Sequence, residues 1–380
     1  MKTNPSLLAS AVFLVLASPG ALLAQAAPLT AAETDLKAKA ADSISRGLDF
    51  LKKQQKPDGF WTSGDYPGLT ALVAQAFIMA PGDHRKDPEV VKALDFIRKH
   101  AQKDGSIHAG RMSVYNTSIC LAALVRNADS KDRAIMDAAN RFLTGGQTKG
   151  SPGGAADGGF GYEAGGKNKG SRADLDNTVF TLEALRLYQD LQKSQDLPAG
   201  QQLNWKAAID FVSRCQQLPG SNKQKWVSNS PDEKGGFVYQ PTPESGDGSG
   251  GPPKSYGTMT YAGLLSFIYA EVKAGDVRVK AAKDWIERHY TVEENPGQGD
   301  QGLYYYYHMM AKGLTAAGVK SLKTKDGKSV DWKTELTAKL ISLQKPDGSW
   351  SSTNGRWMEK DPNLVTTYCL LALEQLAAGK

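Results

Sequence analysis

Asp174 and Asp176 stand two residues apart in the stretch SRADLDNTVF, immediately before an apolar run. Two carboxyl groups this close repel each other when both are charged, so one of them tends to stay protonated and can act as a general acid. The same residues are typical of a helix start, where Asp174 would cap the first turn and Asp176 would lie within it. Both interpretations are open, and they are compatible if Asp174 caps while Asp176 points inward.

Further candidates are aromatic residues and a histidine near the starts of similar apolar segments. Aromatic faces can stabilise a carbocation, although they also pack ordinary helical cores. Among the five histidines, His308 falls within such a segment, LYYYYHMMAK, where it is either a partner of the acid or an interior residue without chemistry. The candidate substrate-binding tyrosines are Tyr115, Tyr256, Tyr261 and Tyr305.

An internal repeat in the sequence indicates on which helices these residues lie. The sequence GLDFL at 47–51 recurs as ALDFI, ANRFL, AIDFV and AKDWI, each within a segment of helical periodicity. Most copies are followed by a glycine-rich turn, best matched in QKPDGFW (55–61) and QKPDGSW (344–350), and then by a second, more apolar helical segment. Apolar residues recur four and seven positions after a fixed point in these segments, with Lys312 as the exception; the fixed points are Thr70, Thr117, Thr178, Thr260, Tyr305 and Thr366.

Six such helix pairs predict an all-α protein in which a ring of apolar helices stands inside a ring of more polar ones. An open solenoid would use the same units. Closure is favoured because the two best-matched turns belong to the first and last repeats. We expect a single domain from 27 to 380, with long loops near 145–172 and 218–256.

The turns that run from glutamine to tryptophan resemble the QW motifs of the squalene–hopene cyclase and protein prenyltransferase β-subunit superfamily. The likeness extends over residues 40–380 and implies that superfamily's (α/α)6 toroid. The segment from Asp174 to Thr178 is similar to the Asp-x-Asp-Asp-Thr motif of class II terpene cyclases, in which the middle aspartate protonates an alkene or epoxide. This resemblance implies that Asp176 is the proton donor and Asp174 its support, whereas Asn177 departs from the last aspartate of the motif.

The same resemblance implies an isomerase of the terpene cyclase/mutase type, which would cyclise an apolar isoprenoid in a central cavity. The alternative is an exported toroid that binds a lipid or a protein without catalysis. Asn177 favours this alternative, because the missing carboxyl group weakens the repulsion that keeps an acid protonated, and a helix N-terminus favours the charged form. The aspartate pair at the start of an inner helix favours the enzyme.

Charge and hydropathy limit the possible partners. The formal net charge of +6 comes without a dense basic cluster, which does not indicate nucleic-acid binding. Residues 1–26 combine one lysine, an apolar stretch and an Ala-Gln-Ala cleavage pattern, which predicts a signal peptide and an exported protein, either periplasmic or secreted. No later run approaches the ~20 apolar residues of a membrane span.

We expect no cofactor and no metal ion. Prenyltransferases of the superfamily hold zinc with an aspartate, a cysteine and a histidine, an arrangement that this sequence does not match. Cys120, His308 and Cys369 share a helical register, but the second and fifth inner helices would stand opposite each other in a ring. Their separation would exceed a zinc bond of roughly 2.0 to 2.3 Å.

Overall fold

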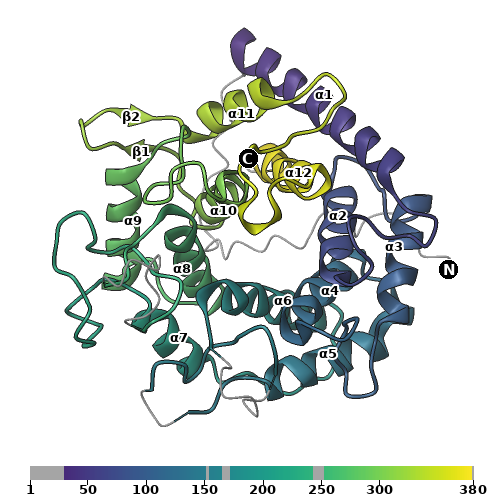
Figure 1. The fold of residues 1–380 in the computed structure, drawn as a ribbon, viewed down its shortest axis with the longest axis horizontal. Coiled ribbons are helices and arrows are strands. Elements are labelled where there is room, and N and C mark those ends of the chain that lie inside the picture. The colour runs from purple at the N-terminus through teal and green to yellow at the C-terminus, as the bar shows by residue number, and fades with distance from the viewer. Residues whose placement is uncertain (1–29, 151–153, 165–171, 243–251, 379–380) are drawn as a thin grey trace.

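The computed structural model describes residues 30–150, 154–164, 172–242 and 252–378. In this part of the chain nearly all regular structure is helical, and Figure 1 shows one ring of helices inside another. The predicted signal peptide, 1–26, lies outside the described residues, as do parts of both predicted long loops.

Outer and inner helices alternate along the chain. The outer layer consists of α1 (Ala31–Gln54), α3 (Pro88–Lys99), α5 (Arg133–Gly145), α7 (Trp205–Arg214), α9 (Val277–His289) and α11 (Trp332–Leu343). The inner layer consists of α2 (Pro67–Met79), α4 (Ser113–Asn127), α6 (Leu175–Ser194), α8 (Gly257–Tyr269), α10 (Leu303–Ala316) and α12 (Pro362–Ala378). The short elements are η1 (Ser130–Asp132), η3 (Arg356–Met358), β1 (Leu322–Lys323) and β2 (Ser329–Val330).

The ring closes where the last helices meet the first. Helix α12 packs against both α1 and α2 (Figure 1). The Nε2 of Gln344, in the turn before α12, donates a hydrogen bond of 2.9 Å to the carbonyl of Ser43 in α1. A Cβ added at Gly47 of α1 would lie 2.8 Å from the side chain of Leu370 of α12, so a larger residue there would require Leu370 to shift. The predicted closed all-α toroid is therefore confirmed, and the open solenoid is excluded.

The QW turns fasten each hairpin to the next. Gln55 donates to the carbonyl of Gly59 within its own turn (3.1 Å) and to that of Glu89 in α3 (2.8 Å). The indole of Trp61 donates back to Leu51 of α1 (2.8 Å). Trp350 makes the same bond to Leu340 of α11 (2.8 Å). Each turn thus satisfies backbone carbonyls of two neighbouring outer helices.

Two turns without a tryptophan use the same glutamine bonds, which the sequence pattern did not reveal. Gln147 donates to the carbonyls of Gly158 (2.9 Å) and Asn204 (3.1 Å). Gln216 donates in the same way within its turn and to the next outer helix, α9. The glutamine, rather than the tryptophan, is therefore the more widely used part of this joint.

The fixed threonines of the inner helices face the turns and not the centre of the ring. In each case the hydroxyl accepts from the backbone N–H at the end of the preceding turn; the pairs are Thr70 with Trp61, Thr117 with Ile107, Thr178 with Phe160, Thr260 with Phe237, and Thr366 with Trp350. In α10 the equivalent buried positions are Tyr306, Met310 and Gly313. The predicted register of this helix is one residue too early, which explains why Lys312 broke the apolar stripe.

Candidate functional site

Asp174 caps α6, as one of the two sequence interpretations predicted. Its Oδ1 accepts from the backbone N–H of Asn177 (2.7 Å), and its Oδ2 accepts from the side-chain amide of the same residue (2.8 Å). The side chain is only 1% exposed. Burial, and then the nearby charge of Asp176, raise the pKa of Asp174 to about 8 against the opposing effect of these hydrogen bonds. At neutral pH Asp174 is therefore mostly a neutral acid.

Two tyrosines from neighbouring turns surround this cap. Tyr162 follows the turn before α6, and although burial raises the pKa of its hydroxyl group overall, the side chains of Asn177 and Tyr239 lie near enough to oppose that rise. Tyr239, from the next turn, accepts from the backbone N–H of Leu175 through its carbonyl (2.8 Å), and its side chain lies near enough to Asp174 to lower the pKa of that carboxyl group. Both tyrosines close a glycine-rich turn in the sequence, DGGFGY and KGGFVY, and that shared position was the signal that could have identified them.

Asp176 points across the centre of the ring. The hydroxyl of Tyr305, in α10, donates to its Oδ1 over 2.5 Å. Helices α6 and α10 are not neighbours, because α8 packs between them. Asp176 is partly buried. Withdrawal from water raises its pKa to about 6, and the bond from Tyr305 limits that rise.

Aromatic rings line the ring's centre beside Asp176. Phe180, one helical turn further along α6, stacks on Tyr305 with 6.2 Å between ring centroids. Tyr115 of α4 meets Phe180 edge-on at 5.7 Å, and Tyr368 of α12 lies 5.2 Å from Tyr305. Helices α4, α6, α10 and α12 together therefore present aromatic faces around one carboxyl group.

The structure brings some predicted residues to this centre and not others. Tyr115 and Tyr305 lie there, and Tyr256, at the start of α8, is close enough for Asp176 to raise its pKa together with burial. Tyr261 lies elsewhere, because it packs against Tyr306 (5.7 Å) between the inner and outer layers.

His308 does not reach Asp176 as a hydrogen-bond partner, and Tyr305 occupies that role. The imidazole is 3% exposed and stacks on Tyr368 with 5.8 Å between centroids. Burial, with the charge of Lys312 adding to it, lowers the pKa of His308 to about 3, so that the ring is neutral. Its Nδ1 has no hydrogen-bond partner among the described residues.

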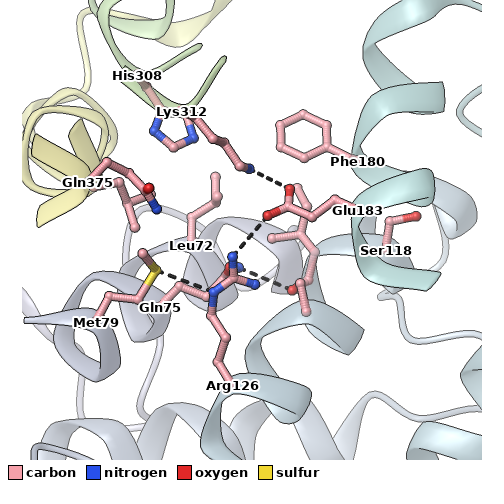
Figure 2. Close-up of a pocket in the computed structure, with 13 residues that line it drawn as sticks. Leu72, Gln75, Met79, Ser118, Arg126, Phe180, Glu183, His308, Lys312 and Gln375 are labelled. Atoms are coloured by element: carbon pink, nitrogen blue, oxygen red, sulfur yellow. Dashed lines mark hydrogen bonds and ion pairs between the residues drawn. The ribbon is translucent and has the colours of Figure 1, made fainter. Parts of the chain in front are cut away.

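A small cavity lies deeper along the ring axis, toward the C-terminal ends of the inner helices (Figure 2). Its volume is about 20 Å³. A buried water needs roughly 10–15 Å³ on this measure, so there is space for one or two waters. The cavity is lined by Leu72, Gln75, Met79, Ser118, Ile119, Ala122, Arg126, Phe180, Glu183, His308, Lys312, Leu371 and Gln375.

Three charged side chains meet at this cavity. Glu183 of α6 accepts from Lys312 of α10 (2.5 Å) and from Arg126 of α4 (2.9 Å), as Figure 2 shows. Burial alone would raise the pKa of Glu183, but the two cations hold it to about 2. We did not predict this trio. Arg126 and Lys312 were the signal in the sequence, since they are the lone Asp, Glu, Lys or Arg residues of α4 and α10, whereas α6 carries several charges besides Glu183.

The described residues show no metal centre and no membrane span. No three His, Cys, Asp or Glu side chains within them are grouped as ligands of one ion. Cys120 and Cys369 are buried free thiols. None of the helices in this part of the chain combines the length and the apolar character that crossing a bilayer requires.

Solved structures of two enzyme types share this fold. A variant of the type II terpene cyclase MstE from Scytonema, with its product merosterolic acid A, matches 90% of this chain and 99% of its own at 11% identity and a TM-score of 0.53. The second is an inactive variant of the GH76A α-1,6-mannanase of Salegentibacter sp. HEL1_6, in complex with α-1,6-mannotriose. The match covers 90% of this chain and 100% of the mannanase chain, at 9% identity and a TM-score of 0.60. These likenesses show the α/α toroid fold, in agreement with the predicted resemblance. No protein-family model and no curated protein matches the chain.

Proposed function

We propose that the protein is an acid-initiated isomerase or cyclase that acts on an alkene of isoprenoid type, with Asp176 as the proton donor. The observation that supports this function most directly is the position of Asp176 on the ring axis, bonded to Tyr305 and flanked by Phe180. A carboxyl group with a raised pKa keeps its proton until substrate arrives. Cation–π attraction from the surrounding rings favours the carbocation that protonation creates.

In the proposed step, Oδ2 of Asp176 gives its proton to one carbon of the alkene. The π electrons form the new C–H bond, a carbocation remains on the other carbon, and Asp176 becomes a carboxylate. The O–H of Tyr305, already aimed at Oδ1, stabilises the new negative charge. An internal alkene can then attack the cation, and loss of a proton from the product back to Asp176 completes an isomerisation without any co-reactant.

The size of the deeper cavity restricts where such a substrate can lie. About 20 Å³ below Phe180 does not hold a prenyl chain. The ligand would instead approach Asp176 from the N-terminal ends of the inner helices, where Asp176 is partly exposed and Tyr162 is 39% exposed. This approach puts the reacting alkene among Tyr115, Phe180 and Tyr305.

The decisive experiment is to incubate mature protein, residues 27–380, with squalene and with prenyl alcohols at pH 5 and pH 8. Products are compared with those of Asp176→Asn by mass spectrometry. We expect an isomerised or cyclised product from the wild type, more of it at pH 5, and none from the variant. A product that forms equally in Asp176→Asn would show that another group is the acid.

A second function, binding without catalysis, is favoured by Asn177, which stands where the class II cyclase motif has its last aspartate. It predicts that wild-type protein retains a lipid in a spin-column assay yet converts none of these substrates at either pH.

We also propose that the protein is exported, on the basis of residues 1–26. N-terminal sequencing of the protein from fractionated producing cells tests this, and an intact Met1 on the mature protein would contradict it.

A further inference from the structure

With Lys312 protonated, the trio at the deeper cavity carries one uncompensated positive charge, although burial lowers the pKa of Lys312. Arg126 and Lys312 share a single carboxylate, that of Glu183. The three side chains are 16%, 11% and 6% exposed, so water screens them poorly. An unbalanced charge in such surroundings is unfavourable unless a counter-ion accompanies it.

Donor capacity at the cavity is also unused. Nη1 of Arg126 has no hydrogen-bond partner among the described residues, although its Nη2 and Nε are bonded to Glu183 and to the sulfur of Met79. His308 lines the same cavity and is more than nine-tenths buried, and its unpartnered Nδ1 is a donor in one of the two neutral tautomers. Figure 2 shows His308 and Lys312 on one side of the cavity and Arg126 on the other.

No other acidic group in the described part of the chain balances the extra charge at the cavity. Glu374 of α12 is buried and precedes Gln375, which lines the cavity. Glu374 itself does not line it. Burial raises the pKa of Glu374 well above the usual range, which favours its neutral form. The charge of Arg126 and Lys312 is therefore offset by Glu183 alone.

We propose that this cavity is a binding site for one compact monovalent anion, such as chloride or formate, held between Arg126, Lys312 and His308. The anion should be monovalent, because the cavity has one positive charge in excess. It should also be compact, because the cavity has space for one or two water-sized groups. Diphosphates and other polyvalent anions are excluded on both grounds.

This site is separate from the proposed acid. Glu183 follows Asp176 by seven residues on α6, which is roughly 10 Å along a helix. Anion binding would also stabilise the ring, because α4, α6 and α10 each contribute one of the charged groups. The inference does not depend on whether Asp176 is catalytic.

The test uses the line width of the chloride NMR signal with mature wild-type protein at pH 6. We expect excess broadening that formate abolishes and pyrophosphate does not. Lys312→Met should remove the broadening, whereas Lys206→Met, which changes a lysine 84% exposed on α7, should retain it. Absence of broadening in the wild type, or equal broadening in Lys312→Met, would overturn the proposal.

A gain of binding provides a second test that loss of folding cannot imitate. Glu183→Gln removes the carboxylate that competes with the anion, so chloride should bind roughly tenfold more tightly than to the wild type. Weaker binding to a folded Glu183→Gln variant would count against the site. If a variant does not fold, anomalous diffraction from wild-type crystals soaked in bromide provides the test. An anomalous peak beside Nη1 of Arg126 supports the proposal, and its absence refutes it.

Discussion

The hydroxyl of Tyr305 on α10 reaches across the ring and donates to Oδ1 of Asp176 on α6, over 2.5 Å. The two helices do not pack side by side, since α8 separates them. The bond therefore exists only because the ring is closed and narrow. Through this bond Tyr305 donates to the carboxylate form of Asp176, and the ring of Tyr305 packs against Phe180 and Tyr368.

Tyr305→Phe should raise the pKa of Asp176, because the bond that favours its carboxylate is lost while the aromatic ring remains. The measurement is a carbon-13 NMR titration of the side-chain carboxyl groups, with Asp176→Asn to assign the signal. Tyr307→Phe is the matched control, since its hydroxyl donates to the carbonyl of Val292 instead (2.7 Å). An unchanged pKa in Tyr305→Phe would mean that this bond does not form in solution.

Stability should fall as the pH rises from about 4 to about 8, because of Asp174. Its pKa is about 8 in the folded protein and about 4 in an unfolded chain. Between these values the folded state binds the proton and the unfolded state does not, so deprotonation favours unfolding. The contribution of Asp174 is thus most favourable below pH 4 and is lost by pH 8.

Asp174→Asn removes the part of the pH dependence that comes from Asp174 and keeps a good N-cap. The side chain of Asn177 can turn its amide to suit the new partner, because its Oδ1 has no hydrogen-bond partner among the described residues. Urea unfolding should show the variant more stable than the wild type at pH 8, with a smaller difference at pH 4.5. The same pH slope for both proteins would contradict the raised pKa.

Glu183→Ala should destabilise the fold by about 3 to 5 kcal/mol, because it leaves Arg126 and Lys312 buried without their shared carboxylate. Asp210→Ala, which breaks the exposed pair with Lys206, should change stability by less than about 0.5 kcal/mol. Denaturant unfolding of both variants measures the difference. Equal effects would show that water reaches the trio and screens it.

Gly348→Ala should weaken the closure of the ring more than an equivalent change elsewhere. Gly348 has a φ of +88°, and an added Cβ would lie 2.3 Å from the carbonyl oxygen of Arg46 in α1. Gly110 has a similar φ of +94° with nothing within 4 Å of an added Cβ. Gly110→Ala should therefore lose only the stability that an alanine loses in a left-handed backbone conformation, about 1 to 2 kcal/mol. Thermal unfolding should show a clearly larger loss for Gly348→Ala.

Local structure could be predicted from the amino-acid sequence. Side-chain periodicity and turn residues act over a few positions, so the helix pairs, the glutamine–glycine turns and the cap at Asp174 could be predicted. Closure was also predictable, because the repeats at the two chain ends match: QKPDGSW joins the start of the chain through Gln344 and Ser43. Where the local signal was ambiguous, as in the tyrosine run of α10, the register was wrong by one residue.

The side chains that meet inside the ring could not be predicted, because their contacts depend on how the helices pack. Periodicity indicates that one face of an inner helix is buried, but it does not distinguish contact with the outer layer from contact with the centre. Tyr261 and Tyr305 look alike in sequence, yet one packs outward on Tyr306 and the other bonds Asp176. Tyr305 and Lys312, which bond Asp176 and Glu183, each lie 129 residues further along the chain, and the diameter of the closed ring sets their distance from α6.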